Sequence, residues 1–346
     1  MSASRQGVQA ARRVSIFLLS SESPAASLPA LREKAQESDG AFLSNSNRTR
    51  IIFALAFIAF ALLPSCSPRS ADAPTTGGAE TREVTDESGR RVRVPIRPRR
   101  VVTLAPNLTE IVYAVGAGDL LVGNTTYCDY PEEARQVAKV GDTLQPNVER
   151  IIALRPEVIF VSTASQLETF TKQLDERGIS VFVTDPHDLE GVFKSIRTLG
   201  ELLGHEDEAA NLVNKLRGRA ARVQEAVLLR PTVKVFYQVS PQPLWTAGSK
   251  SWVTDLIRRA GGKSVTAGVE GEWMRYSDEA ALASRPEAII MATGGEKMEV
   301  APALRNSPAV KAGRVYGING DYLSRPGPRL VDGLEQMARA LHPEVF

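Results

Sequence analysis

Two segments of the chain, residues 147–161 and 277–291, repeat one pattern of residue types at an offset of 130 positions. Each combines a short helical stretch, an Arg-Pro-Glu turn and an apolar run that is typical of a buried parallel strand. A repeat at a fixed offset indicates duplicated architecture, although short helix–strand units are common and a chance likeness is the alternative. The identical pairs are Glu149 and Glu279, Arg155 and Arg285, Pro156 and Pro286, and Glu157 and Glu287.

A long amphipathic stretch, residues 206–228, lies between the two repeated segments. Its apolar residues recur at intervals of three and four, which predicts one buried stripe along a helix. The acids Glu206, Asp207 and Glu208 favour the positive end of that helix, and the residue before Pro231 is pushed out of helical geometry. An ordinary surface helix is the alternative, but the flanking repeats favour a rigid helix between two lobes. The predicted stripe is Ala209, Val213, Leu216, Ala220, Val223 and Val227.

These features predict an α/β protein of two lobes, each with a central, mostly parallel sheet, joined by a single long backbone helix. We assign the amino-terminal lobe to residues 83–186, the connecting helices to 187–230 and the carboxyl-terminal lobe to 231–346. A chain of 346 residues with 43% hydrophobic content suits two globular domains. A net charge of +2 provides no basic field for nucleic acid, and we expect a monomer.

The first 82 residues have the composition of a secretion signal followed by a tether. We predict a disordered extension and the basic start of a signal over 1–50, a lipoprotein signal core with its lipobox over 51–66, and a flexible linker over 67–82. The apolar core ends in Leu-Pro-Ser-Cys, so Cys66 is the predicted lipidation site; a free buried cysteine and an uncleaved anchor are the alternatives. We therefore expect a periplasmic protein, or one on the outer face of the membrane, held by a lipid anchor.

Aromatic side chains gather in segments predicted to be loops, which include 124–131, 240–248 and 319–329. In parallel α/β sheets, ligands bind at the carboxyl ends of the strands, where the first of these loops lies. Flat aromatic faces beside polar anchors suit a large amphipathic ligand better than a bare ion, whereas simple packing is the alternative. The candidates are Tyr127, Trp245, Trp273 and Tyr322 as aromatic faces, with Asp321 and Arg325 as polar anchors.

The sequence lacks the motifs of catalysis and of metal binding. Its three histidines, His187, His205 and His342, are far apart and not in ligand spacing. It has no Gly-x-Ser-x-Gly nucleophile motif, no P-loop and no dinucleotide-binding fingerprint. Two cysteines exclude a disulfide framework and a multi-thiolate metal site. We therefore predict a protein that is not an enzyme, with no catalytic residue, no metal and no catalytic cofactor.

From about Glu83 to its end, the chain resembles the iron-siderophore and cobalamin substrate-binding proteins of ABC importers. The resemblance rests on four stretches: Arg-Val-Val-Thr-Leu-Ala-Pro-Asn-Leu-Thr-Glu over 100–110, Asp-Tyr-Pro over 129–131, the repeated segment over 147–157, and Gly-Gly over 261–262. It implies two α/β lobes on a helical backbone, a transported corrinoid or other metal chelate as ligand, and delivery to the permease dimer of an ABC importer. Within the family, the chain is most similar to the cobalamin-binding members.

The resemblance also implies which residues contact the ligand. Tyr127 matches a ligand-loop tyrosine of the family. Trp245 follows a proline-rich turn, as an aromatic residue of the family does, and Trp273 falls on a pocket tryptophan. The last ligand loop of the family corresponds here to Asp321, Tyr322, Leu323, Ser324 and Arg325.

A second implication concerns Glu149 and Glu279, which the resemblance assigns to docking on arginines of the permease, one glutamate in each lobe. Both stand at the start of a predicted short helix, where the helix dipole alone would also favour an acid. The two interpretations differ because only docking requires the two acids to act as a pair.

The identity of the ligand stays open between cobalamin and a ferric siderophore or haem. Two pocket tryptophans of the cobalamin-binding members align near Thr143 and Ser162 here, and the disulfide of their second lobe is missing. Two other classes are weighed against transport. An enzyme acting on a corrinoid or chelate is disfavoured by the missing nucleophile and metal cluster. A structural surface lipoprotein is disfavoured by the clustered aromatic residues.

Overall fold

The amino-terminal lobe is built on a sheet of four parallel strands in the order β4-β3-β5-β6. The computed structural model describes residues 80–162, 171–174, 176–295 and 298–346. Buried apolar side chains run along the strands without a polar face, as expected for parallel strands covered on both sides. The strands are β3 (Val101–Thr103), β4 (Leu121–Asn124), β5 (Val158–Ser162) and β6 (Ser180–Thr184).

The carboxyl-terminal lobe has a second parallel sheet with the same topology, in the order β10-β7-β12-β13. In both sheets the first strand along the chain lies between the second and the third, and the fourth strand is at the edge. This lobe also has a three-stranded antiparallel sheet, in the order β11-β9-β8. The strands are β7 (Val233–Gln238), β8 (Ser240–Pro241), β9 (Leu244–Ala247), β10 (Gly262–Ser264), β11 (Trp273–Arg275), β12 (Ala288–Thr293) and β13 (Val315–Asn319).

The predicted repeat is confirmed by local geometry. Helices α3 (Val148–Ala153) and α8 (Asp278–Ser284) each lead into the third strand of their sheet. The side chain of Asn147 accepts a hydrogen bond from the Arg150 amide, and the side chain of Ser277 accepts one from the Ala280 amide, so equivalent residues cap the two helices. The residues that end them, Arg155 (φ 48°) and Arg285 (φ 44°), are the only non-glycine residues of the described chain with positive φ.

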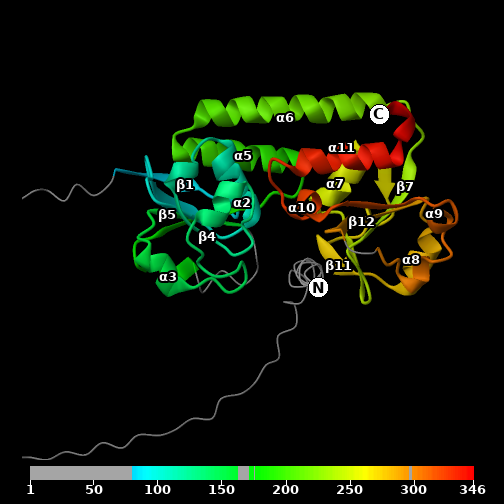
Figure 1. The fold of residues 1–346 in the computed structure, drawn as a ribbon, viewed down its shortest axis with the longest axis horizontal. Helices are drawn as coiled ribbons and strands as arrows, with labels where there is room; N and C mark the ends of the chain where they lie inside the picture. The colour runs from blue at the N-terminus through cyan, green and yellow to red at the C-terminus, as the bar shows by residue number, and fades with distance from the viewer. Residues whose placement is uncertain (1–79, 163–170, 175, 296–297) are drawn as a thin grey trace, which may run out of the picture. The chain divides into compact units, whose positions relative to one another are not determined.

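Helix α6 (Glu206–Val227) crosses both lobes, as Figure 1 shows. It packs on α5 (Leu189–Leu203) toward the amino-terminal lobe and on α7 (Trp252–Arg259) and α11 (Leu330–Leu341) toward the other lobe. All six residues of the predicted apolar stripe are buried. The long connecting helix was therefore predicted correctly, to within one residue at its end.

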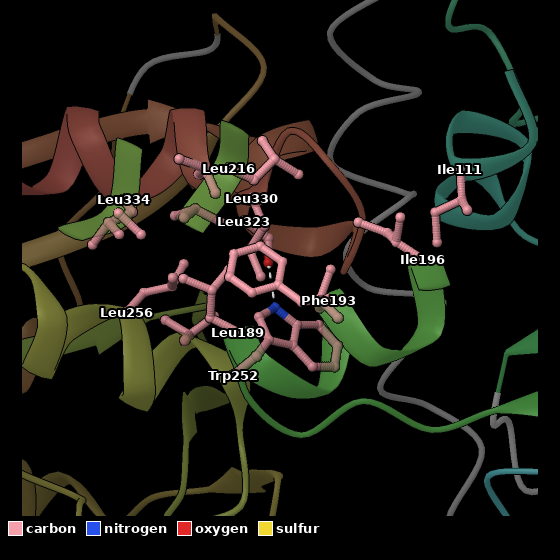
Figure 2. Close-up of a cluster of buried hydrophobic side chains, with 14 of the residues drawn as sticks. Ile111, Leu189, Phe193, Ile196, Leu216, Trp252, Leu256, Leu323, Leu330 and Leu334 are labelled. Atoms are coloured by element: carbon pink, nitrogen blue, oxygen red, sulfur yellow. Dashed lines mark hydrogen bonds between the residues drawn. The ribbon is translucent and has the colours of Figure 1, made fainter. Parts of the chain in front are cut away.

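One continuous apolar core joins the helices and the two sheets, from Val101 in β3 to Val235 in β7. Figure 2 shows its centre, where Phe193 of α5, Leu216 of α6 and Trp252 of α7 pack together. Burial of this apolar surface is the main source of stability for such an arrangement. Because the core is not divided between the lobes, α6 and its neighbours form one packed support for both sheets.

The other described helices are short. Helix α2 begins at Pro106, because proline is well suited to a first helical turn. The α-helices not yet introduced are α2 (Pro106–Ala114), α9 (Pro308–Lys311) and α10 (Gly320–Ser324), and short 3-10 helices cover Gly118–Leu120, Glu132–Gln136, Pro302–Leu304 and Pro343–Val345.

Three predicted irregular segments contain regular structure. The predicted linker extends too far, because β1 (Thr81–Thr85) pairs with β2 (Arg91–Pro95) and Thr81 already lies in the ladder. The predicted loop 240–248 contains the β8–β9 hairpin, whose strands are hidden in the sequence by a proline-rich turn. The predicted loop 319–329 contains α10, which the Asn319 side chain caps by accepting a hydrogen bond from the Asp321 backbone amide.

The membrane-related predictions fall on the amino-terminal part. The signal core and lipobox over 51–66, with Cys66, lie outside the described residues, as do the extension over 1–50 and most of the linker. Within the described ranges, no helix combines the length and apolar character that a membrane crossing requires.

Candidate functional site

A loop after β4 carries Tyr127, which is half-buried. Lys139 holds this loop in place. Its ammonium group donates hydrogen bonds to Asn124 Oδ1 (2.7 Å), to the Cys128 carbonyl (3.1 Å) and to the Ala134 carbonyl (3.0 Å). Burial lowers the pKa of Lys139, while nearby Cys128 and Asp129 oppose that effect. Lys139 was not predicted as a site residue, since nothing in the local sequence pattern indicates which carbonyls it reaches.

Cys128 is the one cysteine among the described residues, and it is buried in this loop. Its Sγ lies 3.2 Å from Thr125 Oγ1, and burial raises the pKa of its thiol. A buried thiol that is protonated at neutral pH is a packing group rather than a nucleophile.

The two predicted ligand tryptophans lie on neighbouring strands of the antiparallel sheet. Trp245 is on β9 and Trp273 is on β11, and the register pairs Arg275 with Trp245 and Trp273 with Ala247. Both indoles are half-buried. The prediction that Trp245 lies in a loop was wrong, but the strand pairing brings the two tryptophans into one sheet.

Trp273 is also part of the core. Its ring centroid lies 5.2 Å from that of Trp252 in an edge-to-face arrangement and 6.4 Å from that of Tyr237. The indole N–H is buried and reaches no acceptor in hydrogen-bond geometry among the described residues. The indole nevertheless acts on the adjacent Glu272 carboxyl, because Trp273 opposes part of the rise that burial causes in the pKa of Glu272.

The segment 321–325 divides its side chains between the core and the surface. Leu323 is fully buried, and its carbonyl accepts a hydrogen bond from Trp252 Nε1 (2.8 Å), as Figure 2 shows. Ser324 is exposed, and its hydroxyl donates to the Gly320 carbonyl (2.7 Å). Tyr322 is half-buried. Leu323 thus supports the segment from within the core, whereas Tyr322 and Ser324 are accessible.

Arg325 ties this segment to the other lobe. Its Nη1 lies 2.8 Å from Asp129 and 3.2 Å from Glu110, and its Nη2 lies 2.8 Å from Asp321. Glu110 and Asp129 belong to the amino-terminal lobe, so the contact joins residues about two hundred positions apart. The ion pairs place the loop of Tyr127 and the segment of Tyr322 beside each other.

Arg329 makes a second connection to the same lobe. Its Nε lies 2.9 Å from Glu110 Oε2, and its Nη2 lies 2.5 Å from Glu110 Oε1, a bidentate pair. The guanidinium carbon is 3.9 Å from the ring centroid of Tyr130 and 5.4 Å from that of Tyr322, within cation–π range. Arg329 therefore bridges aromatic residues of both lobes.

Burial and pairing oppose each other at the two arginines. Burial alone would lower the pKa of Arg325 and of Arg329, but the neighbouring carboxylates outweigh it and raise both. Asp321 and Arg325 were predicted from the sequence, whereas Glu110 and Arg329 were not. An available signal was Glu110 itself, the one charged residue of α2, because a charged side chain requires a partner when it is buried.

The predicted docking acids, Glu149 and Glu279, are both exposed in the first turn of α3 and of α8. Their positions are equivalent in the two lobes, as the repeat predicted. Among the described residues, no group of three or more His, Cys, Asp or Glu side chains is placed to hold a metal ion.

Comparison with known proteins identifies the family. The family model described as periplasmic binding protein matches residues 101–322. A substrate-binding lipoprotein of an ABC transporter in Bacillus subtilis (strain 168) is 33% identical over 309 residues, which is 85% of this chain and 98% of that protein. A vitamin B12-binding protein of Photorhabdus laumondii is 30% identical, over 71% of this chain and 88% of its own. The crystal structure of a periplasmic haem-binding protein from Pseudomonas aeruginosa is 26% identical with a TM-score of 0.65, covering 72% of this chain and 94% of that one.

Proposed function

Because the chain belongs to the periplasmic binding protein family, and is an extracytoplasmic substrate-binding protein of an ABC importer rather than an enzyme, we propose that its ligand is cobalamin. In this proposal, aromatic side chains of both lobes hold the corrinoid between the lobes. The protein then delivers it to the permease dimer. The relative named for vitamin B12 binding, at 30% identity, supports this choice.

The observation that carries the proposal is the ion pair between Asp129 and Arg325, at 2.8 Å. It brings together the loop of Tyr127 and the segment of Tyr322, two predicted ligand elements from opposite lobes. The half-buried Trp245 and Trp273 add flat faces from the carboxyl-terminal lobe. A large ligand with an apolar face and a polar rim suits such a combination.

Haem is the second candidate, because a haem-binding protein shares the fold at 26% identity. A planar macrocycle would use the same aromatic faces, but its carboxylates would need free cationic partners. Arg325 and Arg329 are already paired with carboxylates of the protein. We therefore rank cobalamin first.

Calorimetric titration of the purified protein with cyanocobalamin, haem and ferric siderophores tests the proposal. We expect saturable one-to-one binding of cyanocobalamin and weaker binding, or none, of the other ligands. Tighter binding of haem or of a ferric siderophore would overturn cobalamin and leave the family assignment intact.

We further propose that Cys66 carries the lipid anchor and that Glu149 and Glu279 dock on the permease. The lipoprotein relative and the Leu-Pro-Ser-Cys sequence support the anchor. Mass spectrometry of the protein from a native membrane is the test, with Cys66→Ser as the comparison. We expect a diacylglyceryl mass on the wild-type amino terminus and release of the Cys66→Ser protein from the membrane; a wild-type protein without lipid would refute the anchor.

A further inference from the structure

Five charged residues form a cluster where the amino-terminal lobe meets the segment before α11. We call it the Glu110 cluster. Glu110 and Asp129 come from the amino-terminal lobe, and Asp321, Arg325 and Arg329 come from the other side. Three carboxylates face two guanidinium groups, so the cluster carries one negative charge in excess.

Glu110 is the centre of this cluster. Its side chain is 1% exposed, and its two oxygens accept hydrogen bonds from both Arg325 and Arg329. Arg325 and Arg329 are themselves only 7% and 14% exposed. An outside anion can therefore take over the pairing of either guanidinium only by displacing a carboxylate of the protein. If the displaced carboxylate is Glu110, it would be left buried without its partner, which is strongly unfavourable.

The cluster contains residues assigned to the ligand on other grounds. Asp321 and Arg325 of the cluster were predicted ligand residues, and so was Tyr322, which lies outside the cluster but in cation–π range of Arg329. The charge state of the cluster is thus the charge that the polar rim of a ligand would meet. No free cation of the cluster remains to pair with a carboxylate on the ligand.

We propose that Glu110 is a specificity-determining residue, which keeps Arg325 and Arg329 occupied so that the site accepts ligands with uncharged polar groups and rejects close analogues that carry carboxylates. The inference rests on the proposed placement of the ligand between the lobes. Glu110 acts through the two arginines and does not itself contact the ligand. Side-chain amides, such as those on the rim of a corrinoid, are the groups that suit this site.

Two ligands that differ by a single group test the proposal. The first is cyanocobalamin, and the second is a cyanocobalamin monocarboxylic acid, in which one peripheral amide is hydrolysed. The measured quantity is the ratio of their dissociation constants at pH 7.5, determined by calorimetry on the full-length protein. We expect wild type to favour the amide by at least tenfold. We expect Glu110→Gln to reduce that preference to about threefold or less, mainly by tighter binding of the acid.

Glu335→Gln is the matched control. Glu335 pairs with both Nε and Nη2 of Arg219 (2.9 and 2.8 Å), between α11 and α6 and outside the cluster. This variant also loses a bidentate ion pair. Because that pair lies outside the Glu110 cluster, we expect the variant to keep the wild-type ratio of dissociation constants. Asp129→Asn is a milder second variant, since Asp129 is 27% exposed and its loss frees part of Arg325. It should change the ratio in the same direction as Glu110→Gln if Glu110→Gln does not fold.

The outcomes separate this inference from the proposed function. A wild-type ratio near one, or a ratio unchanged in a folded Glu110 or Asp129 variant, would overturn the role of Glu110 while cobalamin stands as the ligand. If wild type binds neither corrinoid, cobalamin is wrong, and the same ratio is measured with haem and its dimethyl ester. Preference for the ester would then support the role of Glu110, and preference for free haem would overturn it.

Discussion

The two lobes have the same local structure just before the third strand of each parallel sheet, β5 in one and β12 in the other. They differ in the segments that follow the carboxyl ends of the strands. Before this strand, both lobes have a capped short helix with an exposed acid in its first turn, followed by an arginine with positive φ. Beyond the strands, the first lobe has the loop held by Lys139, and the second has the antiparallel sheet with Trp245 and Trp273. The framework and the proposed docking acids are therefore duplicated, whereas each lobe has its own proposed ligand contacts.

Removing Glu149 and Glu279, the acids at equivalent positions of the two lobes, tests the duplicated part of the structure and should give the largest effect. We expect Glu149→Ala combined with Glu279→Ala to abolish or strongly slow ligand-dependent stimulation of the importer's ATPase in liposomes. Each single variant should lose part of it. Exposed charges set encounter rate and register, so ligand affinity in solution should not change. In the single variants, stimulation of the ATPase should also fall further as the salt concentration is raised, because salt screens the remaining acid.

The control for this variant is Glu206→Ala with Asp207→Ala. These two acids are also exposed in the first turn of a helix, α6, so their removal reproduces the loss of helix electrostatics without touching the repeat. Stimulation at the wild-type level in the Glu149 and Glu279 double variant would reduce both acids to helix-start residues.

Truncating Trp245 and Trp273 tests the antiparallel sheet, a part of the structure in which the two lobes differ. We expect Trp245→Ala to weaken cyanocobalamin binding by roughly fivefold, which corresponds to about 1 kcal/mol of stacking. Trp273→Ala should weaken binding and also lower the free energy of unfolding by roughly 2 kcal/mol, because Trp273 packs on Trp252 and Tyr237. Calorimetry and urea unfolding separate the two effects, and Trp245→Phe is the control that keeps an aromatic face. Unchanged affinity in Trp245→Ala would remove Trp245 from the site.

The duplicated framework could be predicted from the sequence because its signals are local and periodic. The stripe of α6 and the Arg-Pro-Glu turns repeat residue types at fixed spacing, and both were found. Trp245 was misplaced because a two-residue strand and a proline-rich turn give no periodic signal. Glu110 and Arg329 were missed because their pairing depends on tertiary structure, which brings residues 219 positions apart into contact.

The two arginines with positive φ allow a finer test of the equivalence. A left-handed conformation costs a non-glycine residue about 1 kcal/mol, and glycine avoids that cost. We expect Arg155→Gly and Arg285→Gly each to raise the free energy of unfolding by up to about 1 kcal/mol, by similar amounts. Arg150→Gly, inside α3, should instead destabilise the protein. Opposite effects at Arg155 and Arg285 would show that the two turns are not equivalent.

The smallest expected effect concerns Glu272, which precedes β11 in the sheet that only the second lobe contains. Burial raises the pKa of Glu272, nearby His187 opposes the rise, and Asp185 adds to it. Above that raised pKa, the folded protein holds an ionised carboxyl that burial disfavours. As the pH falls through it, the folded state takes up the proton before the unfolded state does, so the contribution of Glu272 to stability improves.

Glu272→Gln removes this titration. The variant should therefore unfold at a higher urea concentration than wild type at pH 7.5, and its advantage should shrink as the pH falls through the raised pKa of Glu272. Glu270→Gln is the control two residues away, because Glu270 is exposed and its hydrogen bond and ion pair with Lys250 lower its pKa. That variant should gain no stability at pH 7.5. An advantage of Glu272→Gln that stayed constant with pH would mean that the substitution acts through packing, and that the charge of Glu272 does not destabilise the second lobe.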